Sequence, residues 1–420
     1  MRYVHYKDSG IEWIGEIPQG WSIIKIGQVY DERNEKVSDR EYLPLSVTKM
    51  GIVPQLETVA KTDNGDNRKR VKVNDFVINS RSSRRGSCGI SAHEGSVSLI
   101  NTTLVPKNNM CNKYYNYTFR TECFANEFYR WGNGICDDLW STKWSAMKNI
   151  CIPHPHIDEQ QQIANYLDKK CEKIDRVIEI QKSIIERLKE YKQSVITEAV
   201  TKGLDKFVPL KDSGIEWIGK IPQGWEIYKI KYCVIFNPAY SENLKNGTLV
   251  SFAPMECLTN CCLKCQETTI ESVGNTYTYF AENDVIMAKV TPCFENGNIA
   301  IATNLINKIG FGSSELYVFR TQNINNKFLL YFLQNATFKD MAISAMCGTG
   351  GLKRLPSEFV KNYKLALPSF IEQQQIANYL DKKCEKIDKI IADKELIIEK
   401  LIEYKKSLIY ECVTGKRKVV

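Results

Sequence analysis

The chain has 420 residues, of which 43% are hydrophobic and 25% charged, a composition typical of globular proteins with at least two domains. No apolar run approaches the roughly 18 residues of a transmembrane helix, and the opening residues, MRYVHYKDSG, lack the apolar core of a signal peptide. The formal net charge of +8 permits a nucleic-acid partner without requiring one. An odd number of cysteines, 15, without an export signal predicts reduced thiols in a cytoplasm.

The chain opens with a lead segment that occurs twice. Residues 7–26 read KDSGIEWIGEIPQGWSIIKI, and residues 211–230 read KDSGIEWIGKIPQGWEIYKI. Turn-forming residues alternate with large apolar ones in both copies, which predicts an irregular packed segment followed by a strand, from Trp21 to about Ile26 in the first copy. An internal repeat of this kind predicts two similar units in one chain.

A variable block follows the first lead. The β-like runs at 71–79 and 97–105 predict strands, and aromatic residues at helical spacing predict a helix over 113–130. Two prolines, at 153 and 155, end this block before a long helix, for which Asp158 is the predicted N-terminal cap.

Two long helices are predicted from a second duplication. The segment 159–175, EQQQIANYLDKKCEKID, returns letter for letter at 372–388, and each copy opens a charged, apolar-periodic run that reaches about Gly203 and about Gly415. A helix of about 45 residues is roughly 65–70 Å long at 1.5 Å per residue, so its apolar stripe needs a partner.

The spacing of the stripe predicts that the two helices pair as a coiled coil. Residues seven apart form its first row in each helix: Leu167, Ile174, Gln181 and Leu188, then Leu380, Ile387, Lys394 and Leu401. Its second row is predicted three residues after the first: Lys170, Val177, Ile184 and Tyr191, then Lys383, Ile390, Ile397 and Tyr404.

The second variable block repeats the pattern of the first far more than its sequence. The run 282–290 resembles 71–79, with Asp284 at the place of Asp75, and a helix is predicted over 327–342. Strands are predicted at 299–303 and 315–319. A shared scaffold with different surface residues is typical of two readers of different targets, and equally of structural repeats that have drifted apart.

No catalytic site is predicted. Nucleotide-binding glycine loops and nucleophile–base arrangements are missing from the sequence. The histidines are His5, His93, His154 and His156, and the last two flank Pro155 and are expected to be ordinary surface or linker residues without metal geometry. The cluster Cys257, Cys261, Cys262 and Cys265 lacks both the usual zinc-ligand spacing and a nearby histidine, so we expect no metal there, although thiols so close together leave the question open.

Binding residues are predicted in loops that follow the matching strands of the two blocks. Arginine forks suit phosphates and the guanine edge, asparagine suits the adenine edge, and small residues let the backbone approach a phosphate. The candidates are Arg68, Arg70, Arg81, Ser83, Arg84 and Arg85 in the first block, and Lys289, Thr291, Asn296, Asn298, Lys353 and Arg354 in the second. The alternative for each cluster is a solvated loop.

At these residues the chain resembles the DNA-specificity subunits of type I restriction-modification systems. The motifs are GIEWIGEIPQGW in the lead, FGSSELYVFR at 311–320, GTGGLKRLPSEFVKNYKLALP at 348–368 and the EQQQIANYLD helix opening. The first block departs from the pattern, because residues 132–155 lack a GTGG…KR loop and SLINTTLVP stands where FGSSELYVF would.

The resemblance implies a fold of the α/β (α+β) class with pseudo-two-fold symmetry. Two target-recognition domains, at 1–155 and 205–368, would be joined by long helices at 156–204 and 369–420 that form an antiparallel coiled coil. Each domain would read one half of a split double-stranded DNA site, and the helices would set the gap. Two modification subunits that bind S-adenosylmethionine would dock, with restriction subunits that use ATP and Mg as possible further partners, and this chain would hold no cofactor.

Two other functions compete with this hypothesis. One is a coiled-coil scaffold whose globular ends bind proteins, and the other is an RNA-binding module. A scaffold would not need Arg and Asn at matching strand ends, and RNA-binding modules usually show stacking aromatic residues on an open sheet, for which no motif is evident.

Overall fold

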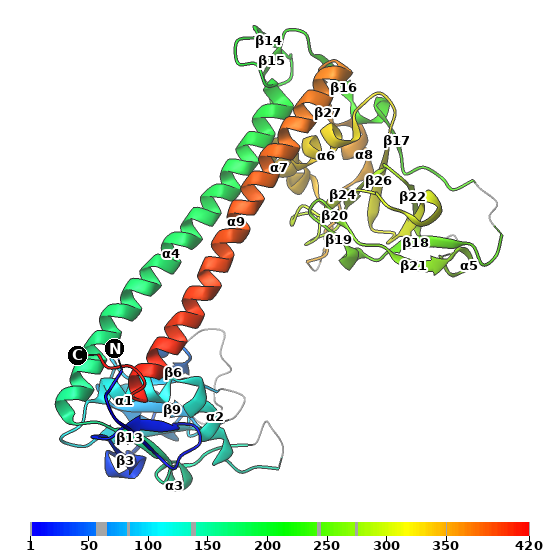
Figure 1. Ribbon diagram of the computed structural model, residues 1–420. Helices are drawn as coiled ribbons and strands as arrows, with labels where there is room; N and C mark the ends of the chain where they lie inside the picture. The colour runs from blue at the N-terminus through cyan, green and yellow to red at the C-terminus, as the bar shows by residue number, and fades with distance from the viewer. Residues whose placement is uncertain are drawn as a thin grey trace. The chain divides into compact units, whose positions relative to one another are not determined.

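The computed structural model describes residues 2–55, 65–81, 85–135, 140–241, 245–273, 276–349 and 351–419. It divides into two compact units: unit 1 consists of Met1–Gln181 with Glu395–Val420, and unit 2 is Lys182–Lys394. Each unit combines one globular block of helices and antiparallel strands with a segment of both long helices (Figure 1). This architecture confirms the predicted fold class.

Both predicted long helices are present. Helix α4 spans Ile157–Lys202 (46 residues) and helix α9 spans Phe370–Val413 (44 residues). The prediction that Asp158 caps the first helix is wrong, because α4 already begins at Ile157. The Asp158 carboxylate lies instead in the first turn, where it faces the positive end of the helix dipole.

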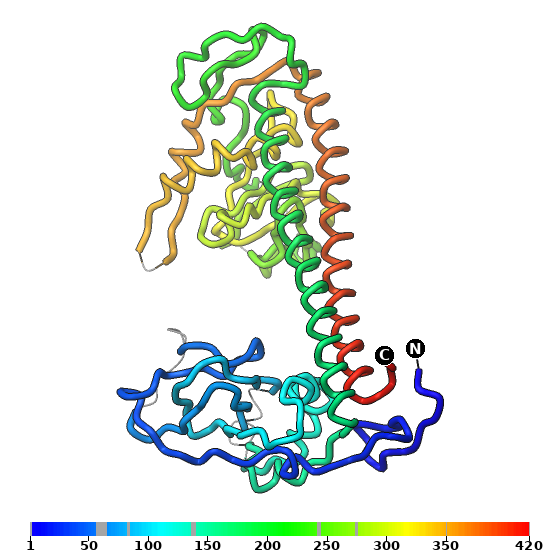
Figure 2. The backbone as a smooth tube through the Cα atoms, turned by 90° about the vertical axis from the view of Figure 1, so that its left-hand side faces the viewer, coloured from blue at the N-terminus to red at the C-terminus, as the bar shows by residue number. Residues whose placement is uncertain are grey.

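The helix segments run antiparallel within each unit (Figures 1 and 2). In unit 1, Lys405 of α9 donates to both carboxylate oxygens of Asp175 in α4 at 2.6 Å, and Leu167 and Leu408 share one buried core. In unit 2, Lys192 of α4 binds Asp388 of α9 in the same way at 2.7 Å. Gln181 and Lys394 are the polar residues midway along the two first rows, and an antiparallel pair predicts that they lie within about one turn of each other. They belong to different units, and their proximity stays a prediction.

The coiled-coil seam confirms one predicted row and corrects the other. Leu167, Ile174, Leu380 and Ile387 are buried, and Gln181, Leu188, Lys394 and Leu401 are half-buried. The second row lies four residues after the first, not three. Its buried members are Cys171, Ile178, Ile185 and Cys384, whereas Val177, Tyr191, Ile390, Ile397 and Tyr404 are 41–48% exposed. Spacings of three and four both fit a heptad, and adjacent apolar pairs such as Val177-Ile178 hid the difference.

The globular block of unit 1 has small antiparallel sheets. The main sheet, in the order β10-β9-β12-β4, consists of Cys88–Ile90, Phe76–Asn79, Asn101–Pro106 and Tyr30–Glu32. Further sheets pair β1 (Tyr6–Asp8) with β2 (Glu16–Pro18), β3 (Ser22–Lys25) with β13 (Cys151–His154), β6 (Leu45–Thr48) with β7 (Gly51–Pro54), and β8 (Arg68–Val71) with β5 (Lys36–Val37) and β11 (Gly95–Val97). The helices are η1 (Ile26–Gln28), α1 (Asn112–Phe119), α2 (Glu122–Arg130) and α3 (Trp144–Met147).

Two predicted elements of unit 1 are each split in two. The expected strand at 71–79 is the end of β8 and the whole of β9, separated by a turn in which Asn74 has a φ of 72°. The expected helix at 113–130 breaks at Thr121, whose hydroxyl oxygen accepts from the Phe124 amide and caps α2. Local capping chemistry therefore overrides a continuous hydrophobic pattern.

The block of unit 2 repeats this plan. Its corresponding sheet, in the order β17-β26-β23-β24, consists of Val234–Phe236, Leu316–Thr321, Val285–Ala288 and Ile299–Ile301. A second sheet, β21-β18-β25-β22, consists of Gln266–Thr269, Leu249–Ala253, Ile309–Gly312 and Thr278–Ala281, with β18 and β25 parallel. Two-stranded sheets pair β14 (Leu210–Asp212) with β15 (Lys220–Pro222), β16 (Glu226–Lys229) with β27 (Lys364–Leu367), and β19 (Leu258–Thr259) with β20 (Cys262–Leu263).

The helices of unit 2 include a broken pair. They are η3 (Ile230–Tyr232), η4 (Met255–Cys257), α5 (Ile270–Val273), η5 (Ile306–Lys308), α6 (Asn326–Gln334), α7 (Ala336–Ala345) and α8 (Ser357–Asn362). The helix predicted at 327–342 is interrupted at Asn335, which ends α6 and caps α7 by accepting from the Phe338 amide.

The repeated EQQQIANYLD segment attaches each block to its helix. In unit 1 the indole of Trp21 donates to Glu159 at 2.9 Å, and in unit 2 that of Trp225 donates to Glu372 at 3.1 Å. The buried amides of Gln160 and Gln373 each satisfy two backbone groups. Gln160 accepts from the Cys111 amide at 2.9 Å and donates to the Pro155 carbonyl at 2.9 Å.

Gln373 makes the equivalent pair of bonds, to the Asn325 amide at 2.8 Å and the Pro368 carbonyl at 3.0 Å. About two turns further on, an aspartate accepts from a tyrosine and a lysine of the block. Asp168 accepts hydrogen bonds from Tyr117 and Lys113 in unit 1, and Asp381 accepts them from Tyr331 and Lys327 in unit 2. The identical sequence thus makes the same contacts twice.

The ends of the chain lie together in unit 1 (Figure 2). The Lys416 ammonium donates to the carbonyls of Ile14 and Glu16 in the first lead, at 2.7 Å each. The Tyr114 hydroxyl donates to the Val413 carbonyl at 2.8 Å, so the last turn of α9 is part of the core of unit 1.

The interpretation of His154 as a linker residue is wrong. It is the last residue of β13, and its Nδ1 lies 2.6 Å from the Tyr115 hydroxyl in a half-buried site. Burial lowers the pKa of its imidazole, which favours the neutral ring at physiological pH.

Gln160→Leu is expected to lower the free energy of unfolding by about 1–3 kcal/mol, because the buried Cys111 amide then loses its acceptor. Chemical denaturation of the full chain measures the change. The matched control is Gln162→Leu, two residues along the same helix on its exposed side, which should change stability by less than about 0.5 kcal/mol. Equal effects of the two substitutions would contradict the attachment role.

Candidate nucleic-acid interface

Two predicted binding segments of unit 2 lie side by side. Val290 and Arg354 form an antiparallel bridge, the Thr291 amide donates to the Lys353 carbonyl at 3.0 Å, and the Leu355 amide donates to the Lys289 carbonyl at 2.8 Å. Cys347 and Arg354 exchange two backbone hydrogen bonds, of 3.0 and 2.8 Å, and so close a hairpin. Figure 2 shows this hairpin standing out from the body of unit 2.

Unit 1 contains the same backbone arrangement. Arg81 and Asn133 each bridge Ser141, as Val290 and Cys347 each bridge Arg354. The Ser80 amide donates to the Ile100 carbonyl at 3.1 Å, as the Lys289 amide donates to the Glu315 carbonyl at 3.0 Å. The Thr142 amide in turn donates to the Ser80 carbonyl at 2.9 Å.

These bonds define what we call the bridged frame. Three of its positions correspond one to one between the units: Ser80, Ile100 and Ser141 in unit 1, and Lys289, Glu315 and Arg354 in unit 2. The first block departs from the family pattern in sequence, yet its described residues keep the hairpin; residues 136–139 lie outside the described part. The backbone is thus held constant while the side chains differ.

In unit 2, Arg354 and Glu315 form a bidentate ion pair. Nε and Nη2 of Arg354 donate to the two carboxylate oxygens of Glu315 at 3.0 and 2.8 Å, and the arginine side chain is 52% exposed. The guanidinium lowers the pKa of Glu315 below its ordinary range. Lys289 donates to the Ser314 carbonyl at 2.7 Å and lies over the Tyr317 ring, so its ammonium is held beside the pair.

Thr291 has a structural position in the bridged frame. Its hydroxyl donates to the Gly351 carbonyl at 2.9 Å and accepts from the Lys353 amide at 2.9 Å, and the residue is buried. It therefore fastens the hairpin, whose Lys353 is exposed.

Asn296 and Asn298 lie apart from the bridged frame. They line a cavity of about 440 Å³ within unit 2, together with residues of α4 and α9. Its lining includes apolar side chains such as Met287 and Phe294, and three lysines: Lys189, Lys192 and Lys339. The two asparagines therefore face the helix pair and not the hairpin.

In unit 1, Arg81 and Arg85 are exposed. The Arg85 guanidinium lies 3.8 Å from the centre of the Tyr129 ring, and Tyr129 packs against Trp140, whose indole donates to the Tyr129 carbonyl at 2.9 Å. An aromatic face therefore orients Arg85 beside the bridged frame. Ser83 and Arg84, also predicted here, lie outside the described residues.

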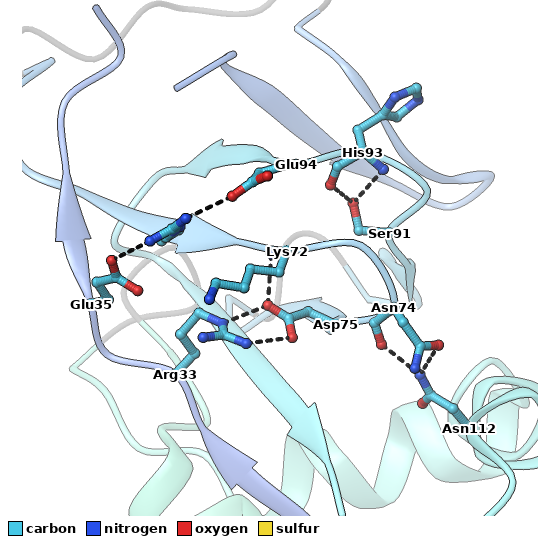
Figure 3. A network of polar contacts seen from close by, with 10 residues as sticks. Arg33, Glu35, Lys72, Asn74, Asp75, Ser91, His93, Glu94 and Asn112 are labelled. Carbon is cyan, nitrogen blue, oxygen red and sulfur yellow. Dashed lines mark hydrogen bonds and ion pairs between the residues drawn. The ribbon is translucent and has the colours of Figure 1, made fainter. Parts of the chain in front are cut away.

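Arg68 and Arg70 are occupied within strand β8. Arg68 is 4% exposed and donates to the Ser96 hydroxyl and carbonyl at 2.8 and 3.0 Å. The two Nη groups of Arg70 bind Glu35 at 2.6 Å and Glu94 at 2.7 Å, and both glutamates are labelled in Figure 3. Both arginines hold the sheet together and offer no exposed fork.

Figure 3 also shows an ion pair that belongs to the shared fold. Arg33 binds the buried Asp75 through Nε and Nη2, and Arg320 binds the buried Asp284 in the same way in unit 2. The match between Asp75 and Asp284 seen in the sequence is therefore structural.

The described residues contain neither a metal-ligand cluster nor a helix that could span a membrane. Among the described residues no cluster of three or more His, Cys, Asp or Glu side chains is placed to hold a metal ion, the group around hairpin β19–β20 included. Within the same ranges, every helix is too short or too polar to cross a bilayer.

Sequence reasoning missed Glu315 and Tyr129. Both orient an arginine that was identified, but each comes from a distant part of the chain, and only the fold brings it to that arginine. The one signal was that Glu315 lies inside FGSSELYVFR, a segment used for the resemblance alone.

The Glu315 carboxyl is expected to titrate below its ordinary pKa of 4.5, and Arg354→Gln should return it toward that value. The stabilisation from the pair should be complete above the unfolded pKa and lost as the pH falls through the lower folded pKa. Carboxyl NMR titration measures both. An unshifted Glu315 in the parent protein would mean that the pair does not form in solution.

Comparison with known proteins adds a second line of evidence. Residues 222–400 match the family model for the type I restriction modification DNA specificity domain. The EcoEI specificity subunit of Escherichia coli is 32% identical over 193 residues, which cover 44% of this chain and 32% of that protein. The EcoAI specificity subunit of Escherichia coli is 35% identical over 162 residues, which cover 37% of this chain and 27% of that protein. This similarity therefore spans about a third of either Escherichia coli protein.

Similarity over the full length is weaker. The MjaVIII specificity subunit of Methanocaldococcus jannaschii is 24% identical over 436 residues, covering 96% of this chain and 94% of that protein. A chain solved in work on the assembly of the type I R-M system matches with a TM-score of 0.72 at 11% identity, over 94% of this chain and 98% of that one. The HsdS subunit from Thermoanaerobacter tengcongensis matches with a TM-score of 0.56 at 14% identity, over 96% of this chain and 98% of that one. Both solved chains share the fold.

Proposed function

We propose, from its similarity to the specificity subunits of type I restriction-modification systems, that the chain belongs to this family and selects the DNA sequence on which such a complex acts. Each globular block would read one half of a bipartite site in double-stranded DNA. The proposed target-recognition domains are residues 1–155 and 205–368.

The observation that carries this proposal is the bridged frame. Its backbone is the same in both units, yet Ser80, Ile100 and Ser141 are replaced by Lys289, Glu315 and Arg354. A protein that reads two different half-sites needs one scaffold with two sets of side chains. A scaffold that only binds the same partner twice would gain nothing from such replacements.

The exposed cations of the bridged frame supply the DNA-binding chemistry. Arg81 and Arg85 in unit 1, and Lys353 and Arg354 in unit 2, can reach phosphates or base edges. Lys289 stands beside them. Arg68, Arg70 and Thr291 are bound within the fold, and we assign them to holding these loops. Ser83, Arg84, Asn296 and Asn298 keep their status as sequence-based candidates.

The helix pair would dock the modification subunits and hold the distance between the half-sites. Apolar side chains stay exposed along it, including Val177 and Ile180 in unit 1, and Ile390 and Tyr191 in unit 2. An exposed apolar row on a long helix is typical of a protein-binding face. The antiparallel Lys–Asp pairs support a fixed register within each unit.

The chain itself would be non-catalytic and hold no cofactor. Modification subunits would bind S-adenosylmethionine and methylate adenine, and restriction subunits, where present, would use ATP and Mg. The complex would act on DNA in the cytoplasm.

Reconstitution with modification subunits, followed by methylation sequencing, tests the proposal. We expect a bipartite methylated motif from the complex and no methyl transfer by the purified chain alone. Replacing residues 27–150 with the equivalent block of a relative should change one half of the motif and leave the other intact. A change in both halves, or a preference for RNA or protein over DNA, would contradict the proposal.

Arg81→Ala and Arg85→Ala are expected to weaken DNA binding. Loss of a base contact should cost about 1–3 kcal/mol of discrimination, and loss of a phosphate contact should flatten the salt dependence by about one unit of slope. Binding measured over a range of salt concentrations separates the two roles. Arg130→Ala is a useful comparison, because Arg130 is also exposed but its guanidinium is already paired with Glu12 and Glu127. If the DNA affinity and its salt dependence are unchanged in both Arg81→Ala and Arg85→Ala, these arginines are solvated surface residues.

A further inference from the structure

We propose that Arg354 reads a guanine in the half-site of unit 2, and that Glu315 is the positioning residue that aims its guanidinium. The inference rests on the proposed function and assigns individual roles within it. It follows from how the Arg354–Glu315 pair is made and from where that pair is absent.

The geometry leaves one fork of Arg354 free. A guanidinium carries five N–H groups, and Glu315 accepts only from Nε and from one N–H of Nη2. The remaining N–H groups, on Nη1 and Nη2, form a second planar fork, and no hydrogen bond to Nη1 is found within the described ranges. Guanine presents O6 and N7 as two adjacent acceptors in the major groove, which such a fork can bind together.

The pair is fixed on both sides, which is what a selective contact requires. The backbone N–H and carbonyl of Arg354 are both bonded to Cys347 across the hairpin. Glu315 is held by its carbonyl, which accepts from the Lys289 amide at 3.0 Å, and by its own amide, which donates to the Ser313 hydroxyl at 3.2 Å. The Arg354 side chain is nevertheless 52% exposed, so the free fork is accessible.

Other arginine–carboxylate pairs in the chain show why this one is distinctive. Arg70 has both Nη groups bound, to Glu35 and Glu94, so its end is closed. Arg33–Asp75 and Arg320–Asp284 share the side-on geometry of Arg354, but they occur at matching places in both units with a buried aspartate. They belong to the common fold.

The Arg354–Glu315 pair is specific to unit 2. At the equivalent positions of the bridged frame, unit 1 has Ser141 and Ile100, which cannot form an ion pair. Among the described residues of the bridged frame, only unit 2 therefore presents an arginine fork that a carboxylate aims.

The Glu315 carboxylate has a second effect on DNA. Its negative charge repels phosphates, so it weakens sequence-independent binding while it orients Arg354. Removing that charge should therefore raise the affinity for non-specific DNA and lower the discrimination for guanine. A residue with only a structural role would not move these two quantities in opposite directions.

The test uses the complex of the full chain with its modification subunits. The 27–150 exchange first identifies which half of the motif unit 2 reads. Competition binding then compares DNA carrying guanine or adenine at each fixed position of that half, for the parent and for Arg354→Lys, Arg354→Gln and Glu315→Gln. Lys231→Gln, at an exposed position of η3 in the globular block of the same unit, is the charge-matched control.

Arg354→Lys keeps the charge but not the fork, so guanine preference at one position should fall roughly ten- to a hundred-fold with an unchanged salt slope. Arg354→Gln should lose the preference and flatten the slope. Glu315→Gln should reduce the preference and tighten non-specific binding. Lys231→Gln should leave the preference intact, and in every variant the half-site of unit 1 should stay unchanged, which shows that the complex is assembled.

Two results would overturn the inference alone: a unit 2 half-site without a fixed guanine, or full guanine preference in Arg354→Lys. A third result would also overturn the inference: recognition of both half-sites is lost in Arg354→Gln and equally in Arg354→Lys. Arg354 would then be needed for the fold and not for reading guanine. A parent complex that methylates no bipartite motif would instead overturn the proposed function itself.

Discussion

The attachment of each globular block to its long helix is the constraint on which the rest of the structure depends. It consists of an indole–carboxylate bond, a buried glutamine that satisfies two backbone groups, and an aspartate that accepts from a tyrosine and a lysine. Because buried amides must be satisfied, this set of contacts tolerates little variation. The letter-for-letter repeat of EQQQIANYLD is the sequence record of that requirement, and it leaves the far side of each block free to vary.

The sequence was sufficient for everything that depends on period and repetition. Both long helices, their pairing and the duplicated plan follow from the heptad pattern and the two repeated segments. The phase of the seam was not readable, because Val177-Ile178, Ile184-Ile185 and Ile390-Ile391 offer an apolar residue on either side. Burial resolves it in favour of the later residue of each pair. The breaks at Thr121 and Asn335 escaped prediction for a related reason, since a single capping side chain ended a helix inside a continuous apolar pattern.

The candidate site was predictable only in part. Composition indicates which residues are cationic, but not which are already neutralised. Arg68 and Arg70 are close to the other arginines in sequence, yet Arg68 donates its hydrogen bonds to a serine and Arg70 donates to two glutamates. Lys289 and Arg354 are far apart in sequence, yet two backbone bonds bring their segments together. Equivalence between Ser80, Ile100 and Ser141 and the charged triplet of unit 2 rests on long-range hydrogen bonds, which no local pattern encodes.

The location of both chain ends in unit 1 has a consequence for biosynthesis. Unit 2 is one uninterrupted stretch, whereas the core of unit 1 includes Leu408, Cys412 and Val413 from the end of α9. During synthesis on the ribosome, all of unit 2 can therefore be made while the N-terminal part of unit 1 still lacks the core residues that the end of α9 supplies. The block that emerges first is the last to become native, and until then the exposed apolar surface along α4 is a target for chaperones and for premature aggregation.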